Sequence, residues 1–425
     1  MISEHVPGDA APGSTTPAPS AAPPPTRQRI ADRDFVIRLA LALHSYGTPV
    51  HRLESAIGEV SAALGLEVSV FATPTAVFTS FRDAGVDDTR FDRQNSGEVD
   101  LGKLAELDEL ARRVIAGELD PSAGAKQVDE LVKRPARGRG WKRWAAYGIA
   151  SAGFAIFFGA APAEVLWALV LGSFVGTLEG AMVPGRWQQL FEPTGAVLIA
   201  LAAGLLAATF GTSAPVLTVA GIIVLVPGLS LTQSVTELAQ GSLVSGSSRF
   251  LGTMLSFLML GFGSELGRRL ATLLVTVPEA SMPSAWPLWQ QLGAVTLSSM
   301  AFAVIFRARR KDVGAIVALS LVTYLVIHAV RPSFGAVFTA LVGALVVGCG
   351  SNAFARVSRR PSLVLRVPVM LILVPGSFGL RSVLMLVEAD VLHGVETAFT
   401  MLFLAVALAA GLLTANALVQ PRQRL

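Results

Sequence analysis

The polar and apolar positions divide the chain into two parts. Residues 26–143 carry charges throughout, and their apolar side chains recur at helical or strand spacing, whereas residues 144–419 consist mostly of long apolar runs. An apolar run of about 20 residues is long enough to cross the ~30 Å hydrocarbon core of a bilayer. The pattern therefore predicts a soluble domain followed by a membrane domain.

The charged part predicts a small α+β domain. Gly47 suits the left-handed position after a helix, and Thr48 with Pro49 suits the N-cap and first residue of the next one. The expected elements are helices over 33–46 and 49–65, two short strands on either side of Thr73-Pro74, and amphipathic helices over 101–116 and 122–133.

The apolar part predicts ten membrane spans. They cover about 144–161, 163–183, 191–210, 214–240, 243–266, 290–306, 312–330, 333–350, 363–387 and 393–418. The fourth and ninth differ from the rest, because each carries only about a dozen apolar residues before a Pro-Gly pair. Each is long enough to cross only if its helix continues beyond the break.

The two broken spans belong to a longer repeat. Val-Pro-Gly recurs 148 residues apart, at 226–228 and 374–376. The segment from Gly153 matches the segment from Ala301 at the same offset, and the segment from Gly195 matches that from Gly335 at an offset of 140. Five spans followed by five similar spans indicate a duplicated unit. An odd number of spans inserts the second copy in the opposite orientation, as in the inverted repeats of secondary transporters.

The predicted fold is thus a mainly α-helical integral membrane protein, with ten transmembrane helices as two inverted five-helix repeats and a small α+β soluble N-terminal domain. The expected boundaries are 1–25 for a disordered Pro/Ala-rich tail, 26–140 for the soluble domain, 141–289 for the first repeat and 290–425 for the second.

The charges between spans orient the chain. With the N-terminus inside, the outer connections carry only three cations: Arg268, Arg269 and Arg331. The inner ones carry eleven: Arg186, Arg307, Arg309, Arg310, Lys311, Arg356, Arg359, Arg360, Arg366, Arg422 and Arg424. The positive-inside rule then predicts an inner-membrane protein whose termini and soluble domain are cytoplasmic.

Composition supports the membrane assignment and narrows the chemistry. The chain is 52% hydrophobic and 15% charged. Its net charge of +4 comes from basic residues beside apolar segments, so a nucleic-acid partner is not expected. The first 25 residues lack the apolar core of a signal peptide. A single cysteine, Cys349, excludes an internal disulfide and a Cys-based metal site, and no cofactor is predicted.

The two Pro-Gly breaks are the predicted binding site. Proline removes a backbone donor, and such breaks persist in a membrane only where protein or water satisfies the backbone. The second half of each broken helix presents an N-terminus that favours a carboxylate. The predicted substrate-binding residues are Pro227, Gly228, Ser230, Thr232, Arg249, Pro375, Gly376, Ser377 and Arg381.

Ionisable residues within spans are functional candidates. Glu237 is the predicted proton-coupling group, and it is expected to pair with Arg249 across neighbouring helices. Arg249 or Arg381 would assist the substrate carboxylate. Glu265, Glu388 and Asp390 are equally compatible with headgroup-level positions.

The soluble domain offers few catalytic candidates. His44 and His51 lie on either side of a Gly-Thr-Pro break, so they do not share a helix face as metal ligands would. We expect them at a helix end and on the surface. The domain contains no Gly-x-Ser-x-Gly, Walker A or zinc motif, so an enzyme is not predicted.

Four motifs in order resemble the threonine/serine exporter family: "SYGTPVHRLESAIGEVSAALGL", "VFATPTAVFTSF", "LVPGLSLTQSVTELAQGSLVSGSSRFLG" and "ILVPGSFGLRSVLML". The resemblance covers about residues 33–419 and implies export of small hydroxy-amino acids in exchange for protons. The matching polar residues of the soluble domain are Arg52, Glu54, Pro74 and Thr75. The first break matches at Pro227, Gly228, Glu237, Gly246 and Arg249, and the second at Pro375, Gly376 and Arg381. Glu237 stands where the family often has Asp.

Three alternatives stay open. Related two-protein versions resemble dicarboxylate exporters, so the same scaffold could carry a succinate-like substrate. A membrane protein with a hydrolase-like soluble domain would need a nucleophile and a base. A channel would conduct without saturation or proton coupling. The expected partners are a small-molecule substrate (an amino acid or a dicarboxylate), protons and the lipid bilayer, with a homo-oligomer left open.

Overall fold

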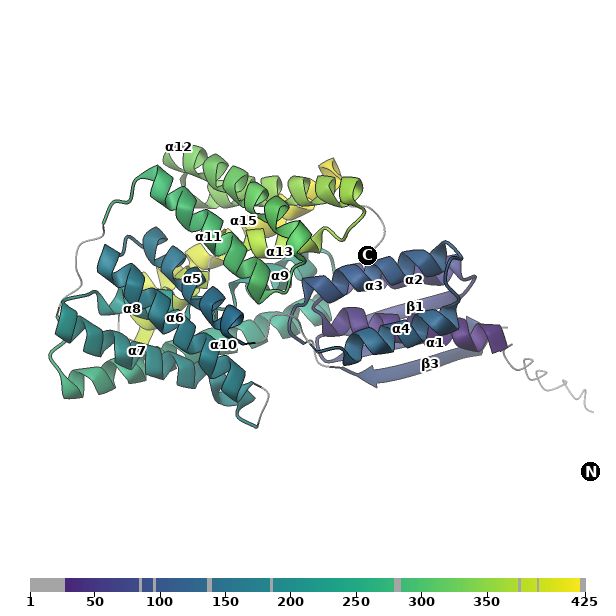
Figure 1. Cartoon of the computed structure of the whole chain (residues 1–425), viewed down its shortest axis with the longest axis horizontal. Coiled ribbons are helices and arrows are strands. Elements are labelled where there is room, and N and C mark those ends of the chain that lie inside the picture. Colours follow the sequence, from purple (N-terminus) through teal and green to yellow (C-terminus); the bar gives the residue numbers. More distant parts are fainter. Residues whose placement is uncertain are drawn as a thin grey trace, which may run out of the picture.

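The computed structural model describes residues 27–83, 86–94, 97–135, 140–183, 186–278, 284–373, 376–387 and 390–420. The predicted tail, Pro375 and Glu388 lie outside these ranges. The described chain forms an N-terminal unit, residues 27–133, and a helical unit, residues 141–418, which lie side by side along the long axis (Figure 1).

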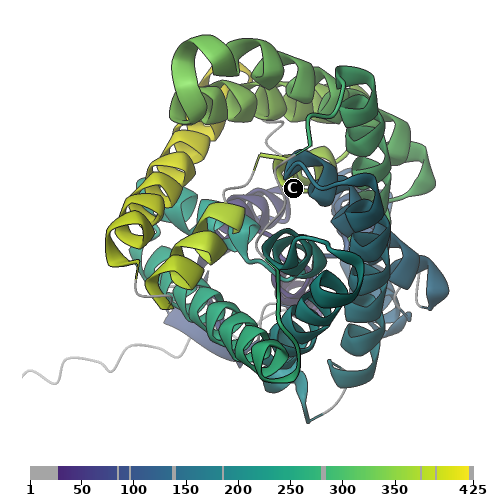
Figure 2. The same ribbon diagram turned by 90° about the vertical axis from the view of Figure 1, so that its left-hand side faces the viewer.

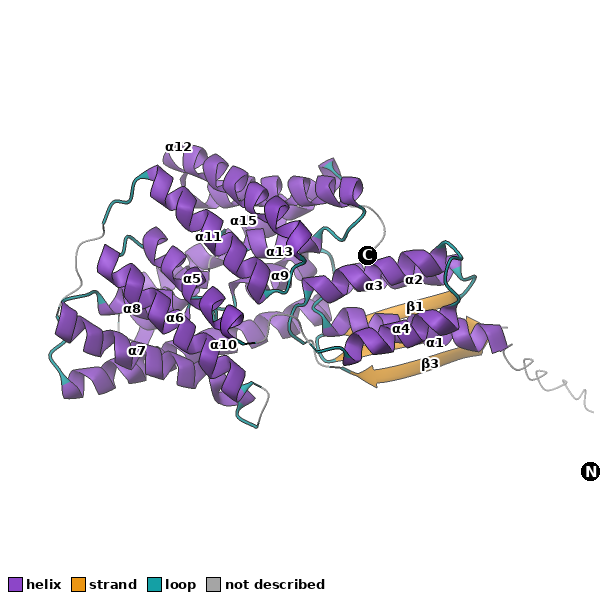
Figure 3. Ribbon diagram, viewed as in Figure 1, coloured by secondary structure: helices purple, strands orange, loops and turns teal. Residues whose placement is uncertain are grey.

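The N-terminal unit combines four helices with a three-stranded sheet, and its third and fourth helices pack on the first. Its elements are α1 (Arg27–Ser45), α2 (Val50–Ala63), β1 (Glu67–Thr73), β2 (Ala76–Asp83), β3 (Val86–Arg93), α3 (Leu101–Ile115) and α4 (Pro121–Lys133). The strands form an antiparallel meander in the order β1-β2-β3. All strands of the described chain lie in this unit (Figure 3). The four predicted helices and the two predicted strands are confirmed.

The third strand was not predicted. Residues 86–93 read "VDDTRFDR", and their charges hide the alternation of a strand. β3 is an edge strand whose described side chains are mostly exposed on both faces, and cross-strand pairs hold it to β2. The Phe91 and Phe78 rings lie 4.9 Å apart, and Arg82 donates to Asp87 at 3.0 Å.

The turn between α1 and α2 follows the prediction only in part. Gly47 has a φ of 83°, which is the left-handed conformation expected there. The predicted cap is wrong, because Pro49 occupies the N-cap position and α2 begins at Val50. The hydroxyl of Thr48 is buried without a hydrogen-bond partner. The turn is packed against the helical unit, and this packing determines where α2 starts.

The helical unit contains eleven α-helices among the described residues and one 3-10 turn. They are α5 (Trp141–Phe157), α6 (Pro162–Met182), η1 (Gln188–Leu190), α7 (Phe191–Phe210), α8 (Ala214–Ile222), α9 (Gly228–Ala239), α10 (Leu243–Leu274), α11 (Leu288–Ile305), α12 (Arg310–Ser358), α13 (Leu363–Met370), α14 (Gly376–Val387) and α15 (Val391–Leu418). Six of the described helices are long and apolar enough to cross a membrane: α6, the combined segment Gln188–Phe210, α10, α11, α12 and α15.

Helix α12 folds back on itself. Its backbone leaves the helical conformation at Gly335, where φ is 71°. A Cβ at Gly343 would lie 2.9 Å from Ile327, and one at Gly350 would lie 2.5 Å from Leu319. These contacts pair residues at nearly equal distances along the chain on either side of Gly335. The two halves of α12 are therefore antiparallel, as expected for the separate segments 312–330 and 333–350.

The two halves of the helical unit repeat the same close contacts. A Cβ at Gly267 would meet the Val197 carbonyl at 2.3 Å, and one at Gly411 would meet the Leu341 carbonyl at 2.4 Å. Both positions of the second contact lie 144 residues after those of the first. The contacts therefore relate the two helices by an offset of 144 residues, whereas the sequence predicts an offset of 140. The difference of four residues is about one helical turn. Figure 2 shows the resulting flanks, with α7 and α10 in teal opposite α12 and α15 in green and yellow.

Positions related by the offset of 148 also touch each other. The rings of Phe154 and Phe302 lie 6.0 Å apart, and a Cβ on Gly376 would lie 3.5 Å from the Cα of Gly228. Both contacts join positions that the sequence repeat relates by 148 residues. Helix α5 starts beside the N-terminal unit and α11 ends beside it, so these two helices run in opposite directions.

The N-terminal unit is docked on the helical unit. The backbone N–H of Leu101 donates to the Phe306 carbonyl at 2.9 Å, and Glu98 accepts from both Arg143 and Arg307. The core of the N-terminal unit also includes Leu363 and Val367 of α13, so the two units share one apolar cluster at their junction.

Candidate functional site

The two helix breaks meet inside the helical unit. The first separates α8 from α9, and the second separates α13 from α14. A Cβ on Gly376 would lie 2.7 Å from the Val226 side chain, so only glycine allows the approach. Because the second helix of each pair begins at the crossing, the N-termini of α9 and α14 face the same region.

A pocket lies at this crossing and is named the break pocket. It encloses about 430 Å³, open solvent included, and is lined by Phe154, Ile223, Val224, Val226, Phe302, Phe306, Leu371, Gly376 and Ser377. Phe154 with Phe302 and Ile223 with Leu371 are pairs related by 148 residues, so both halves contribute corresponding residues to the pocket. Its lining is mainly apolar, and Ser377 supplies the side-chain hydroxyl.

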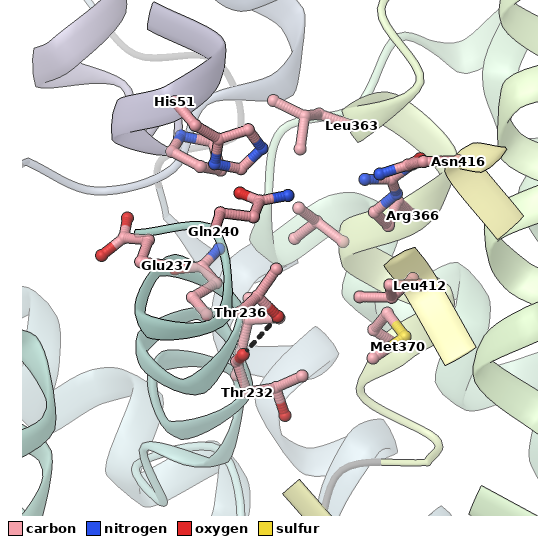
Figure 4. Close-up of a pocket in the computed structure, with 14 residues that line it drawn as sticks. His51, Thr232, Thr236, Glu237, Gln240, Leu363, Arg366, Met370, Leu412 and Asn416 are labelled. Carbon is pink, nitrogen blue, oxygen red and sulfur yellow. Dashed lines mark hydrogen bonds between the residues drawn. The ribbon is translucent and has the colours of Figure 1, made fainter. Parts of the chain in front are cut away.

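A second pocket lies where the two units meet and is named the interface pocket. It encloses about 540 Å³, open solvent included (Figure 4). Its lining comes from α2, α9, α13 and α15 and comprises Pro49, His51, Leu229, Thr232, Gln233, Thr236, Glu237, Gln240, Leu363, Arg366, Val367, Met370, Leu412 and Asn416. Met370 lines this pocket and its neighbour Leu371 lines the break pocket.

Glu237 is a buried carboxylate between the two units. Its side chain is 1% exposed. It accepts hydrogen bonds from Arg249 Nε at 3.1 Å, from Arg249 Nη2 at 3.3 Å and from Ser245 Oγ at 3.0 Å. The backbone N–H of Val50 also donates to it, at 3.4 Å. The predicted pair with Arg249 is present, and the first turn of α2 completes the site.

The polar residues of the N-terminal motifs gather near Glu237. His44 is 2% exposed, and its Nε2 lies 3.1 Å from the carbonyl of Gln94, whose N–H donates to the Thr75 carbonyl. Glu54 accepts from the N–H of Ala72 at 3.4 Å and joins α2 to β1. Burial lowers the pKa of His44. His44 lies in the last turn of α1, a helix end as expected, but it is buried and not on the surface.

Arg366 is a buried cation held by two amides. Its Nη2 donates to Asn352 Oδ1 at 2.9 Å and to Asn416 Oδ1 at 3.2 Å. Its Nε is buried and makes no hydrogen bond, and no described carboxylate pairs with it. The sequence prediction counted Arg366 among exposed connection charges, and the structure corrects this by placing it inside α13 at 8% exposure.

Two more pocket side chains have buried polar atoms without partners, namely His51 Nδ1 and Gln240 Oε1. Burial, with the nearby charges of Arg52 and Arg366, lowers the pKa of His51 to about 3, so its ring is neutral at pH 7. His51 lies in the first turn of α2, a helix end as expected, and it is partly buried in the interface pocket. Both residues lie in motifs quoted above, but the sequence does not mark them as pocket residues, because their positions depend on contact between distant segments.

The other predicted residues are distributed differently. Thr232 lines the interface pocket and donates to the Gly228 carbonyl at 3.2 Å, whereas Ser230 is partly buried outside both pocket linings. The Arg381 guanidinium is exposed and lies 5.2 Å from the centre of the Phe158 ring. Arg381 therefore does not share a site with Arg249. Pro227 is the N-cap of α9 and Pro74 with Thr75 forms the β1–β2 turn.

The remaining ionisable candidates have simple environments. Burial lowers the pKa of Arg52 to about 10, which leaves it charged at pH 7. Glu265 is paired with Arg268 and Arg269, and Asp390 lies 2.9 Å from His393. Within the described ranges, no group of three or more His, Cys, Asp and Glu residues is arranged to hold a metal ion.

Comparison with known families decides the class of protein. Residues 34–271 match the threonine/serine exporter family model, and residues 291–418 match a second model, described as "Threonine/Serine exporter, ThrE". The chain belongs to the threonine/serine exporter family. The first match includes the N-terminal unit, the first break, Glu237 and Arg249. The second includes Arg366, the second break and α15.

Similar curated proteins come from yeasts. An uncharacterized protein of Schizosaccharomyces pombe is 24% identical over 368 residues, which are 81% of this chain and 47% of that protein. Pheromone-regulated membrane protein 10 of Pichia sorbitophila is 24% identical over 380 residues, covering 86% of this chain and 37% of that protein. The chain thus spans about half of these relatives or less. No solved structure matches it.

Proposed function

We propose that this member of the threonine/serine exporter family is a secondary active transporter that exports threonine, serine or a similar small hydroxy-amino acid in exchange for protons. The observation that carries the proposal is Glu237, a buried, arginine-paired carboxylate that follows the first helix break and lines the interface pocket. A protonatable group at a broken helix can couple proton transfer to substrate binding.

The proposed architecture is ten spans in two inverted five-helix repeats, within domain boundaries 26–140, 141–289 and 290–425. Support comes from the equivalent contacts at Gly267 and Gly411 and from the opposite directions of α5 and α11. In this arrangement the two halves rock around the break pocket, and the substrate moves between it and the interface pocket.

The proposed location is the inner membrane of a bacterial-type cell, with both termini and the N-terminal unit in the cytoplasm. The excess of cations in the inner connections supports this orientation. Arg307 is one of these cations, and it contacts Glu98 of the N-terminal unit. The proposed partners are a small solute, protons and lipid.

The test is counterflow of labelled threonine, serine and succinate in proteoliposomes, with and without a pH gradient. We expect Glu237→Gln to abolish the response to the gradient. Glu265→Gln is the matched control, because Glu265 is also buried and arginine-paired but lines neither pocket. Undiminished, gradient-dependent transport by Glu237→Gln would reject the proton role.

The runner-up is export of a dicarboxylate, and Arg366 favours it. Together with Arg52, it adds positive charge near the interface pocket without an acidic partner among the described residues. Faster counterflow of succinate than of threonine or serine would select this function. A hydrolase-like role for the N-terminal unit has less support, since the family assignment indicates transport.

A further inference from the structure

We infer that Arg366 binds the carboxylate of the transported solute in the interface pocket, and that Gln240 accepts an N–H bond from the same solute. This inference rests on the proposed function and identifies the recognition residues. Neither residue belongs to the helix breaks, which both family and sequence patterns favour as the site.

The environment of Arg366 fits a ligand-binding cation. A buried guanidinium usually pairs with an acidic side chain, because a buried charge without a counterion is costly. Here the partners are two neutral amides, Asn352 and Asn416. They orient the guanidinium and leave its charge uncompensated. Its Nε–H is buried, unbonded and available to an anion at the pocket wall.

The asparagines form a rigid support for this cation. Asn352 Nδ2 donates to Asn416 Oδ1 at 3.0 Å and to the Val419 carbonyl at 2.8 Å. The support therefore joins α12 to α15, while Arg366 itself comes from α13. Because three helices fix the guanidinium, its position is prepared before a ligand arrives, which lowers the ordering cost of binding.

The opposite side of the pocket supplies an acceptor. Gln240 Oε1 is buried and unbonded, and Figure 4 shows Gln240 between His51 and Arg366. Glu237 lies on the side of the pocket away from Arg366, and its carboxylate is already paired with Arg249. A solute with a carboxylate at one end and an ammonium at the other would satisfy both unbonded atoms. An α-amino acid has this chemistry.

The N-terminal unit closes the same pocket. Pro49 and His51 line it at the start of α2, and the neutral His51 ring adds no second positive charge beside Arg366. The site is thus built from both units. A bound solute would lie between the N-terminal unit and the breaks.

The test compares each ligand with its amide, so that the carboxylate is removed without altering the protein. Binding of threonine, serine, succinate, threoninamide and succinamide is measured with the purified full-length protein in nanodiscs. We expect threonine to bind wild type roughly 10- to 100-fold more tightly than threoninamide, in proportion to the loss of a charged hydrogen bond. Arg366→Gln should bring this ratio close to one, and Arg366→Lys should keep part of it.

Arg356→Gln is the matched control, because it removes the same charge from an exposed position on α12. It should leave the acid-to-amide ratio unchanged. Gln240→Leu should weaken threonine binding and spare succinate, which has no ammonium group. Unchanged threonine affinity in this variant would remove Gln240 from the site.

The outcomes separate this inference from the proposed function. Threonine transport with an unchanged acid-to-amide ratio in Arg366→Gln would overturn the inference and leave the function standing. Arg366-dependent binding of succinate without threonine transport would reject amino-acid export and remove Gln240 from the site, because succinate has no N–H, but it would support Arg366 as the carboxylate-binding residue. Equal affinity of wild type for every acid and its amide would overturn the inference outright.

Discussion

The guanidinium of Arg249 in α10 donates hydrogen bonds to both carboxylate oxygens of Glu237 in α9, at 3.1 and 3.3 Å. Only a short turn separates these two helices along the chain. Glu237 is 1% exposed and the Arg249 side chain 18% exposed. Removing one partner of a buried pair leaves an uncompensated charge. We therefore expect Arg249→Ala to lower the free energy of unfolding by about 3 kcal/mol, the low end for buried pairs. Denaturant titration of the purified protein measures this.

A double-mutant cycle distinguishes the ion pair from lost packing. The variant Glu237→Gln/Arg249→Gln removes both charges and should recover much of the loss seen in Arg249→Gln. Strictly additive losses would show that the two side chains act independently.

Substitution at Gly376 tests the meeting of the breaks. A Cβ there would lie 2.7 Å from Val226, closer than real Cβ contacts. We expect Gly376→Ala to reduce the transport rate at least about tenfold, because a misplacement near 1 Å has effects of this size at functional sites. Proteoliposome counterflow gives the rate. Gly252→Ala, where the space around the Cβ is open, should transport normally.

The junction of the two units can be tested at Gly102. A Cβ on Gly102 would lie 2.8 Å from the carbonyl oxygen of Arg307, which belongs to the chain at the end of α11. We expect Gly102→Ala to weaken the contact between the two units. Hydrogen exchange should then be faster for the backbone amides in the first turn of α2, where the Val50 N–H donates to Glu237. Gly58→Ala has open space on α2 and should slightly stabilise the protein, by up to about 1 kcal/mol. Equal exchange in both variants would contradict the role of this contact.

His51 gives a prediction about pH. Its folded pKa is about 3 and its ordinary value is 6.5, so below pH 6.5 the unfolded chain binds a proton that the native protein does not. The contribution of His51 to the free energy of unfolding is therefore fully retained above pH 6.5. It is lost progressively as the pH falls from 6.5 toward 3. Between pH 7 and pH 5, wild type should lose about 2 kcal/mol more than His51→Gln. Parallel pH profiles of unfolding check this, and identical slopes would contradict it.

Sequence patterns predict the periodic features of this protein well. Helical spacing and apolar length locate nearly every helix, and a single short turn brings Glu237 to Arg249. The strand at 86–93 escapes prediction because its edge position allows charged residues. The third helix of each repeat aligns one turn out of register, since its small apolar residues match almost equally at either offset.

Arg366 shows why the candidate site was harder to predict. A cation at the start of an apolar run has the same sequence pattern whether it reaches solvent or is enclosed by neighbouring helices. Its burial depends on Asn352 and Asn416, which lie 14 and 50 residues away. His51 and Gln240 likewise become pocket residues only through docking of the two units.

The repeat also shows an imbalance between the two faces of the helical unit. By the offset of 148, Glu237 corresponds to Met385 and Arg366 corresponds to Thr218. Equivalent positions of the two halves thus carry different side chains at these two places. If identical halves carried identical side chains, a solute would meet the same affinity from either direction. Here the two positions are chemically unequal, so under the proposed function a solute would meet different side chains on its two approaches.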